Sequence, residues 1–200
     1  MEIRSDSGAS ATTAPSMMAF MDSDVTQLAR DINALCRLRG RFTLRSGQVS
    51  AEYFDKYLFE ADPVLLARVT QHLRMHVPDG TDLLGGLELG GIPLVTMLSQ
   101  ATGIPALFVR KQAKSYGTRR LAEGGDPAGR TVVLVEDVIT TGGAVIAAAR
   151  ALRELGATVT TVVCAIDRSS PGAEQLTGEG IVVRAVLTKG LLDTADAVGA

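Results

Sequence analysis

The sequence contains no tryptophan, and aromatic residues make up only 4% of its 200 residues. Proteins that bind single-stranded nucleic acids stack bases on aromatic side chains, so the shortage argues against that function. A formal net charge of −2 also lacks the basic excess of a general nucleic-acid binder. No apolar run approaches the ~18 residues of a membrane span, so we expect neither nucleic acid nor a membrane as a partner.

Cysteine and histidine are equally scarce, with two of each. Cys36 and Cys164 lie far apart among apolar neighbours, which favours two small buried hydrophobic residues in a reducing cytosol over a disulfide or metal pair. His72 and His76 are one helical turn apart, but no third ligand of matching kind is evident, so surface or packing roles are favoured. A secretory leader would need an apolar core that the N-terminal segment lacks, and we expect a cytoplasmic protein.

Hydrophobic residues make up 46% of the chain, which is enough to bury the core of one domain. Residues 1–21 are rich in Ser, Ala, Thr and Gly without apolar periodicity, and we expect a disordered tail there. The sequence alone does not decide whether translation starts at Met17, Met18 or Met21. Residues 22–200 are predicted to form a single domain, divided into a small hood or flap over 22–60 and a core over 61–200.

Hydrophobic periodicity predicts an α/β protein. The hood is expected to hold a helix over 24–39, ended by Gly40, and short strands within 41–50 and 53–57. A helix over 63–76 follows. Strands over 82–87, 106–110, 132–135, 158–166 and 181–187 then alternate with helices over 94–102 and 144–155, which predicts a mostly parallel central sheet flanked by helices, with right-handed crossovers.

The segment Val132–Gly143 is the most informative part of the sequence for a ligand site. A buried strand leads into Glu136 and Asp137, and the loop Val138–Gly143 opens the next helix. Such loops line the crevice where open α/β sheets bind ligands, and two threonines, two glycines and a helix N-terminus suit a phosphate. The carboxylates suit sugar hydroxyls or a hydrated divalent cation. The alternative is an ordinary strand-to-helix crossover with acids at the end of the strand.

Two further segments carry weaker signals. The Gly-rich turn Leu89–Pro93 is a plausible pyrophosphate contact, although one such turn is not specific. The segment Lys111–Asp126 is long, poor in apolar residues and rich in Lys and Arg. Its length and its position just before the acid-bearing strand favour a binding loop or lid over a merely solvated loop.

Val132–Gly143 closely resembles the 5-phosphoribosyl 1-pyrophosphate (PRPP) signature of the type I phosphoribosyltransferases. Three other segments resemble the orotate phosphoribosyltransferases in the same chain order. They are Phe42–Gly47 with Ser50 and Tyr53–Asp55; Arg110–Gly117, which matches a mobile catalytic loop; and Asp167-Arg168. The resemblance spans residues 24 to 190.

The resemblance implies the type I phosphoribosyltransferase fold and the joining of orotate and PRPP into orotidine 5′-monophosphate and pyrophosphate, a step of de novo pyrimidine (UMP) biosynthesis. Mg²⁺ is the implied cofactor, held through substrate oxygens and water with no direct protein ligand. The mobile loop of one subunit would reach the neighbouring active site, so the resemblance also implies a homodimer.

The family motifs assign roles to individual residues. Lys114 and Asp137 are expected to be catalytic. The residues expected to bind PRPP are Arg110, Lys111, Lys114, Tyr116, Glu136, Asp137, Val138, Ile139, Thr140, Thr141, Gly142 and Gly143. Those expected to bind orotate are Arg45, Tyr53, Phe54, Thr141 and Arg168, whose guanidinium would pair with the orotate carboxylate.

The chain departs from the family pattern at two positions. Arg45 stands where many members carry Lys, which keeps the charge but changes its geometry. Gly90 stands where many members carry Lys, so one cation for pyrophosphate is missing and the loop lysines are expected to take its part. A phosphoribosyltransferase for another base and a non-catalytic PRPP-binding regulator remain as alternatives.

Overall fold

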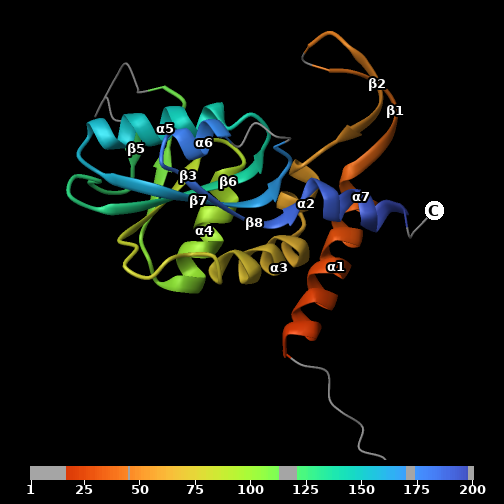
Figure 1. The fold of residues 1–200 in the computed structure, drawn as a ribbon, viewed down its shortest axis with the longest axis horizontal. Coiled ribbons are helices and arrows are strands. Elements are labelled where there is room, and N and C mark those ends of the chain that lie inside the picture. The colour runs from red at the N-terminus through yellow and green to blue at the C-terminus, as the bar shows by residue number, and fades with distance from the viewer. Residues whose placement is uncertain (1–16, 45, 113–120, 170–173, 198–200) are drawn as a thin grey trace, which may run out of the picture.

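The computed structural model describes residues 17–44, 46–112, 121–169 and 174–197. Its centre is a six-stranded sheet with the order β5-β4-β3-β6-β7-β8 (Figure 1). The parallel strands are β3 (Leu83–Leu87), β4 (Ala106–Val109), β6 (Thr131–Ile139), β7 (Thr158–Asp167) and β8 (Val182–Thr188). The short edge strand β5 (Ala122–Glu123) pairs antiparallel with β4. The predicted, mostly parallel sheet is confirmed.

Helices cover both faces of this sheet (Figure 1). One face carries α1 (Met17–Cys36), α3 (Pro63–Arg74) and α4 (Gly91–Thr102), and the other carries α5 (Gly143–Glu154) and α6 (Glu174–Gly178). Alternate residues of β6 serve the two layers: Val133 and Val135 join the first core, and Val132 and Leu134 join the second. Two strongly hydrophobic layers thus fix β6 in the middle of the molecule.

The hood is an antiparallel hairpin of β1 (Arg37–Thr43) and β2 (Val49–Phe54), which extends away from the core (Figure 1). The short helix α2 (Tyr57–Ala61) returns the chain to the core, where Phe59 is fully buried. Asp62 then caps α3 by accepting hydrogen bonds from the amides of Val64 and Leu65, both at 2.9 Å, with Pro63 in the first helical turn. The C-terminal helix α7 (Lys189–Ala197) packs beside α1.

The helix and strands of the N-terminal part have other bounds than predicted. α1 begins at Met17, so it includes residues 17–21 of the segment expected to be a disordered tail; residues 1–16 lie outside the described residues. α1 ends at Cys36 rather than Arg39, because Arg37–Arg39 pair with Phe54–Glu52 in the hairpin. Tyr57 belongs to α2 and not to a strand.

Three short elements of the core were not predicted: β5, α6 and α7. β5 lies inside the basic segment 111–126, and its two residues pair with Phe108 and Val109. β6 also runs further than predicted, through Ile139, so Glu136 and Asp137 belong to the strand and not to the loop after it. Pairing of β6 with β7 as far as Ile139 and Asp167 supplies the reason.

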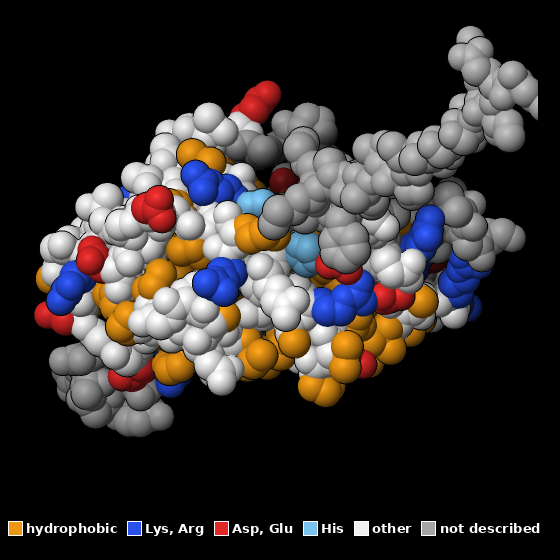
Figure 2. All heavy atoms as spheres, turned by 90° about the horizontal axis from the view of Figure 1, so that it is seen from below, with side chains coloured by type: hydrophobic (Ala, Val, Ile, Leu, Met, Phe, Trp, Pro, Cys, Tyr) orange, Lys and Arg blue, Asp and Glu red, His pale blue; other side chains and the backbone are white. Residues whose placement is uncertain are grey.

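Both cysteines are buried and free, and they lie on opposite faces of the sheet, as expected for small hydrophobic residues. Buried His72 contacts the Asp24 carboxylate through Nε2 at 3.0 Å, which matches its predicted packing role. The face seen from below mixes acidic and basic side chains around the histidines, in pale blue (Figure 2). None of the described helices combines the length and apolarity needed to cross a membrane.

Candidate active site

The carboxyl ends of β6 and β7 meet at one edge of the sheet and bring the predicted site residues together. Ile139 of β6 lies opposite Asp167 of β7. The amide of Arg168 donates to the Ile139 carbonyl at 2.8 Å, which sets Arg168 beside Thr140. The ends of parallel strands form the ligand crevice of α/β sheets, so this edge is the natural place for a site.

A tight turn, Thr140–Gly143, joins β6 to α5. Thr140, Thr141 and Gly143 are exposed, whereas Gly142 is buried with a left-handed φ of 74°. A Cβ on Gly142 would lie 2.9 Å from the side chain of Leu176, so glycine is required there for space as well as conformation. No side chain caps the N-terminus of α5, which leaves its first amides available for an anion.

Val138 and Ile139 take no part in this turn, contrary to their predicted place in the loop. Both belong to β6, and the Ile139 side chain is buried in the core under α5. The Ile139 side chain therefore faces the core and not the turn.

A cavity of about 510 Å³ opens between the hood and the end of the sheet, a size typical of small-molecule sites. It unites three of the residues predicted to bind the base, namely Tyr53, Phe54 and Arg168, with Thr140; Thr141 is not among its lining residues. The Arg168 guanidinium lies 5.2 Å from the centre of the Phe54 ring, a stacking contact that orients it. The other lining residues are Arg37, Leu44, Ser50, Glu52, Lys189 and Asp193.

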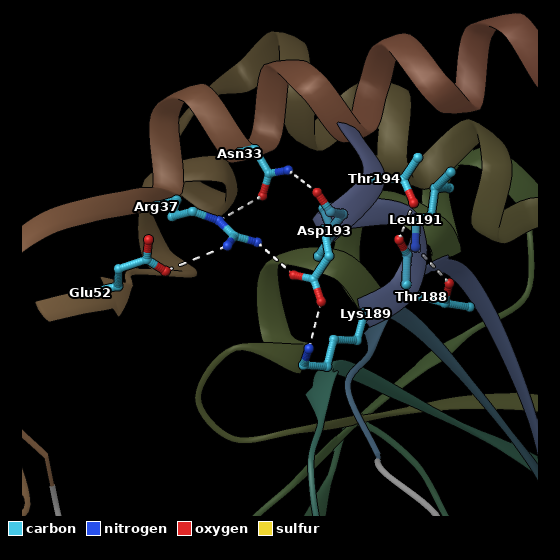
Figure 3. Close-up of polar contacts among 10 residues, drawn as sticks. Asn33, Arg37, Glu52, Thr188, Lys189, Leu191, Asp193 and Thr194 are labelled. Carbon is cyan, nitrogen blue, oxygen red and sulfur yellow. Dashed lines mark hydrogen bonds and ion pairs between the residues drawn. The ribbon is translucent and has the colours of Figure 1, made fainter. Parts of the chain in front are cut away.

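Two of the cations at this cavity are already neutralised, as Figure 3 shows. Arg37 pairs with Glu52 at 3.5 Å and with Asp193 at 3.0 Å, and Lys189 pairs with Asp193 at 2.5 Å. No ion pair joins Arg168 to another described residue. Arg168 is therefore the described cation of this cavity that remains open to an anionic ligand.

The acid pair lies deeper than predicted. Asp137 is fully buried, and its Oδ2 forms an ion pair with the ammonium of Lys56, just before α2. Its Oδ1 accepts the Val138 amide at 2.5 Å. Glu60, on the inner side of α2, is 7% exposed and faces Asp137. Three carboxyl groups, those of Glu60, Glu136 and Asp137, thus lie around the Lys56 ammonium, and Lys111 also acts on Glu136.

Burial and mutual repulsion change the protonation of these acids. Burial, together with the hydrogen bond and charge of Asp137, raises the pKa of Glu60 to about 8. Burial and the charge of Asp137 raise the pKa of Glu136 to about 8 as well. Burial lowers the pKa of Lys56, but its contact with Asp137 outweighs this and leaves the pKa above its ordinary value. At neutral pH these shifts favour a Lys56–Asp137 ion pair beside protonated Glu60 and Glu136.

The basic segment is only partly described. Lys114 and Tyr116 lie outside the described residues, as does Arg45. Arg110 and Lys111 line a separate cavity of about 240 Å³ between α5 and the sheet. The Lys111 amide donates to Glu88 Oε1 at 2.7 Å. The described residues therefore do not bring Arg110 and Lys111 into the cavity that holds Arg168.

Sequence reasoning missed Lys56 and Glu60, and also the rim residues Arg37, Lys189 and Asp193. Lys56 directly follows the matched segment Tyr53–Asp55. Because a strand was predicted over 53–57, the contact of Lys56 with Asp137 was not expected. Glu60 follows the apolar Leu58 and Phe59, and a charged residue beside such buried neighbours was the available signal.

The parallel sheet, the phosphate-sized turn after its acid-bearing strand and the adjoining cavity define an α/β protein of the phosphoribosyltransferase class. A family model described as phosphoribosyl transferase domain matches residues 64–183. An orotate phosphoribosyltransferase of Nocardioides sp. is 64% identical over 180 residues, which cover 90% of this chain and all of that protein.

Solved structures agree with this class. Orotate phosphoribosyltransferase of Mycobacterium tuberculosis H37Rv in complex with Fe(III) dicitrate superposes with a TM-score of 0.76 at 34% identity, covering 84% of this chain and 98% of that one. The same enzyme in complex with PRPP gives a TM-score of 0.73 at 31% identity, covering 85% and 99%. The chain therefore belongs to the orotate phosphoribosyltransferase family and is a transferase with the predicted type I fold.

Proposed function

We propose that this chain transfers the 5-phosphoribosyl group of PRPP to orotate, in the synthesis of pyrimidine nucleotides, through the site at the ends of β6 and β7. The position of Arg168 in the cavity is the single observation that supports orotate as the base. Orotate differs from uracil by a carboxylate. A ring-stacked guanidinium in a base-sized cavity, with no ion pair to another described residue, matches that group. An uncharged base gives such a cation no partner.

The rest of the site suits PRPP. Displacing pyrophosphate builds positive charge on the sugar and negative charge on the leaving group. Thr140, Thr141, Gly142 and Gly143 would hold the 5′-phosphate at the N-terminus of α5. Glu136 and Asp137 would face the ribose hydroxyls and the developing cation.

The basic segment would carry the leaving group. Arg110, Lys111, Lys114 and Tyr116 are assigned to pyrophosphate, with Lys114 as the catalytic cation, and Arg45 to orotate. The position of Arg110 and Lys111 in a separate cavity favours a homodimer in which this segment serves the neighbouring subunit. Light scattering coupled to size-exclusion chromatography tests this, because a monomer would contradict the shared site.

Mg²⁺ is the proposed cofactor, and its role would be to neutralise the diphosphate of PRPP. Within the described residues, no group of three or more His, Cys, Asp or Glu side chains lies close enough to hold a metal. As is usual for Mg²⁺, the ion would be held chiefly through PRPP oxygens and water. The two buried free thiols favour a cytoplasmic setting.

One assay tests the function. Orotate absorbance is followed with the purified protein, PRPP and Mg²⁺, and uracil, adenine and hypoxanthine are the comparison bases. Consumption of orotate alone supports the proposal. Turnover of another base would assign a different phosphoribosyltransferase, and PRPP binding without any turnover would indicate a regulator.

A further inference from the structure

Lys56 and Gly90 both approach the same oxygen, Oδ2, of the buried acid Asp137. A Cβ on residue 90 would lie 1.5 Å from Asp137 Oδ2 and 2.9 Å from Glu60 Oε1, so the two carboxyl groups fill the space of a side chain there. The Lys56 ammonium pairs with that same Oδ2 and lies beside the same space. A cation thus stands next to residue 90 although residue 90 itself carries none.

The position of this ammonium suits the diphosphate of PRPP. Gly90 is the N-cap of α4, a twelve-residue helix whose first amides no side chain caps. If the 5′-phosphate lies at α5 and the ribose at Asp137, the diphosphate on the anomeric carbon points toward the N-terminus of α4. The Lys56 side chain is 31% exposed, so its ammonium reaches solvent on one side while it neutralises Asp137 on the other.

We infer that Lys56 is a substrate-binding residue of the reaction, whose ammonium neutralises Asp137 in the empty site and binds the diphosphate of PRPP in the occupied site. The inference rests on the proposed function and replaces the expectation that the loop lysines alone compensate for Gly90. Ribose hydroxyls would take over the hydrogen bonding of Asp137 as Lys56 turns to the diphosphate.

Glu60 acts in this exchange as a positioning residue. Its carboxyl faces Asp137 from α2. A proton shared between Glu60 and Asp137 keeps the Asp137 carboxyl in place when Lys56 leaves it. The other groups around Glu60 are Glu136, the Lys56 ammonium and the Cys36 thiol at the end of α1.

Binding of inorganic pyrophosphate, measured by titration calorimetry with Mg²⁺ present, tests the role of Lys56 directly because this probe has no ribose. Lys56→Gln should weaken pyrophosphate binding by about 10-fold or more, the effect of losing a charge-assisted hydrogen bond. Lys56→Arg should recover most of the affinity. Arg130→Gln removes an equal charge at the opposite end of β6 and should change nothing.

A second set of variants distinguishes direct binding by Lys56 from a role in which Lys56 merely supports Asp137. In an Asp137→Asn background, residue 137 carries no charge for Lys56 to neutralise. If Lys56 binds the diphosphate directly, Lys56→Gln should still weaken pyrophosphate binding in this background and leave ribose 5-phosphate binding unchanged. This background also guards against misfolding, since it leaves no uncompensated charge. Unchanged pyrophosphate affinity on adding Lys56→Gln to this background overturns the inference, whereas failure of the wild-type protein to consume orotate overturns the proposed function instead.

Discussion

Replacing Arg168 by Gln removes the described cation of the base cavity that no other described residue neutralises, while keeping a similar length of side chain. Truncating one partner of a desolvated charge pair costs about 2–5 kcal/mol. Arg168 is only partly buried, so we expect the lower part of this range, about 2–3 kcal/mol, or a loss of about 30- to 150-fold in kcat/KM for orotate.

The structure supplies two graded controls. Lys189→Gln removes the same charge from the same cavity, but Lys189 is exposed and already paired with Asp193, so kcat/KM should stay within about five-fold. Phe54→Leu removes the ring beneath the guanidinium but keeps apolar volume, and should cost about two- to five-fold.

Steady-state kinetics with orotate and PRPP varied in turn are the appropriate assay. The loss in Arg168→Gln should appear with orotate and leave KM for PRPP nearly unchanged. Equal losses in Arg168→Gln and Lys189→Gln would refute the assignment, because the effect would then belong to the overall charge of the cavity and not to a specific carboxylate contact.

Three further predictions concern the interior. Gly90→Ala should reduce kcat/KM for PRPP by about 10-fold or more, because the new methyl group displaces Asp137. The loss in kcat/KM for orotate should be much smaller, and values equal to wild type for PRPP would contradict this packing. Since Glu60 has a pKa of about 8 when folded and an ordinary value of 4.5, the folded chain keeps a proton that the unfolded chain loses, and the free energy of unfolding should fall as pH rises between those values. Urea titrations should show a shallower fall in Glu60→Gln, and an unchanged slope would disprove the shift. Asn33→Ala should cost about 1–3 kcal/mol in the same titrations, because it leaves the buried Leu192 carbonyl of α7 without its donor.

Local sequence patterns were sufficient for the parts of the fold that depend on neighbouring residues. The alternation of strands and helices after residue 82 follows from hydrophobic periodicity, and the structure has it. The predicted loop Val138–Gly143 is present only over Thr140–Gly143, because β6 runs through Ile139. Arg168 was assigned through a two-residue motif, and the structure brings it to the cavity that also holds Phe54.

Long-range pairing explains what the sequence did not reveal. The end of α1 depends on Arg37 meeting Phe54 across a hairpin, and the length of β6 depends on its partner β7. Lys56 and Asp137 are far apart in the sequence, and no local pattern signals that an ammonium before one short helix will neutralise an acid in a central strand. Such contacts exist only after the hood has packed on the core.

The membership of Glu136 and Asp137 in β6 has a mechanical consequence. The backbone around these acids is paired with β7 in the sheet, and β6 is also paired with β3. Lys56 and Glu60, by contrast, are attached to a five-residue helix at the end of an outlying hairpin. We therefore expect the segment that carries Lys56 and Glu60 to adjust to a bound molecule, while β6 holds the two acids in place.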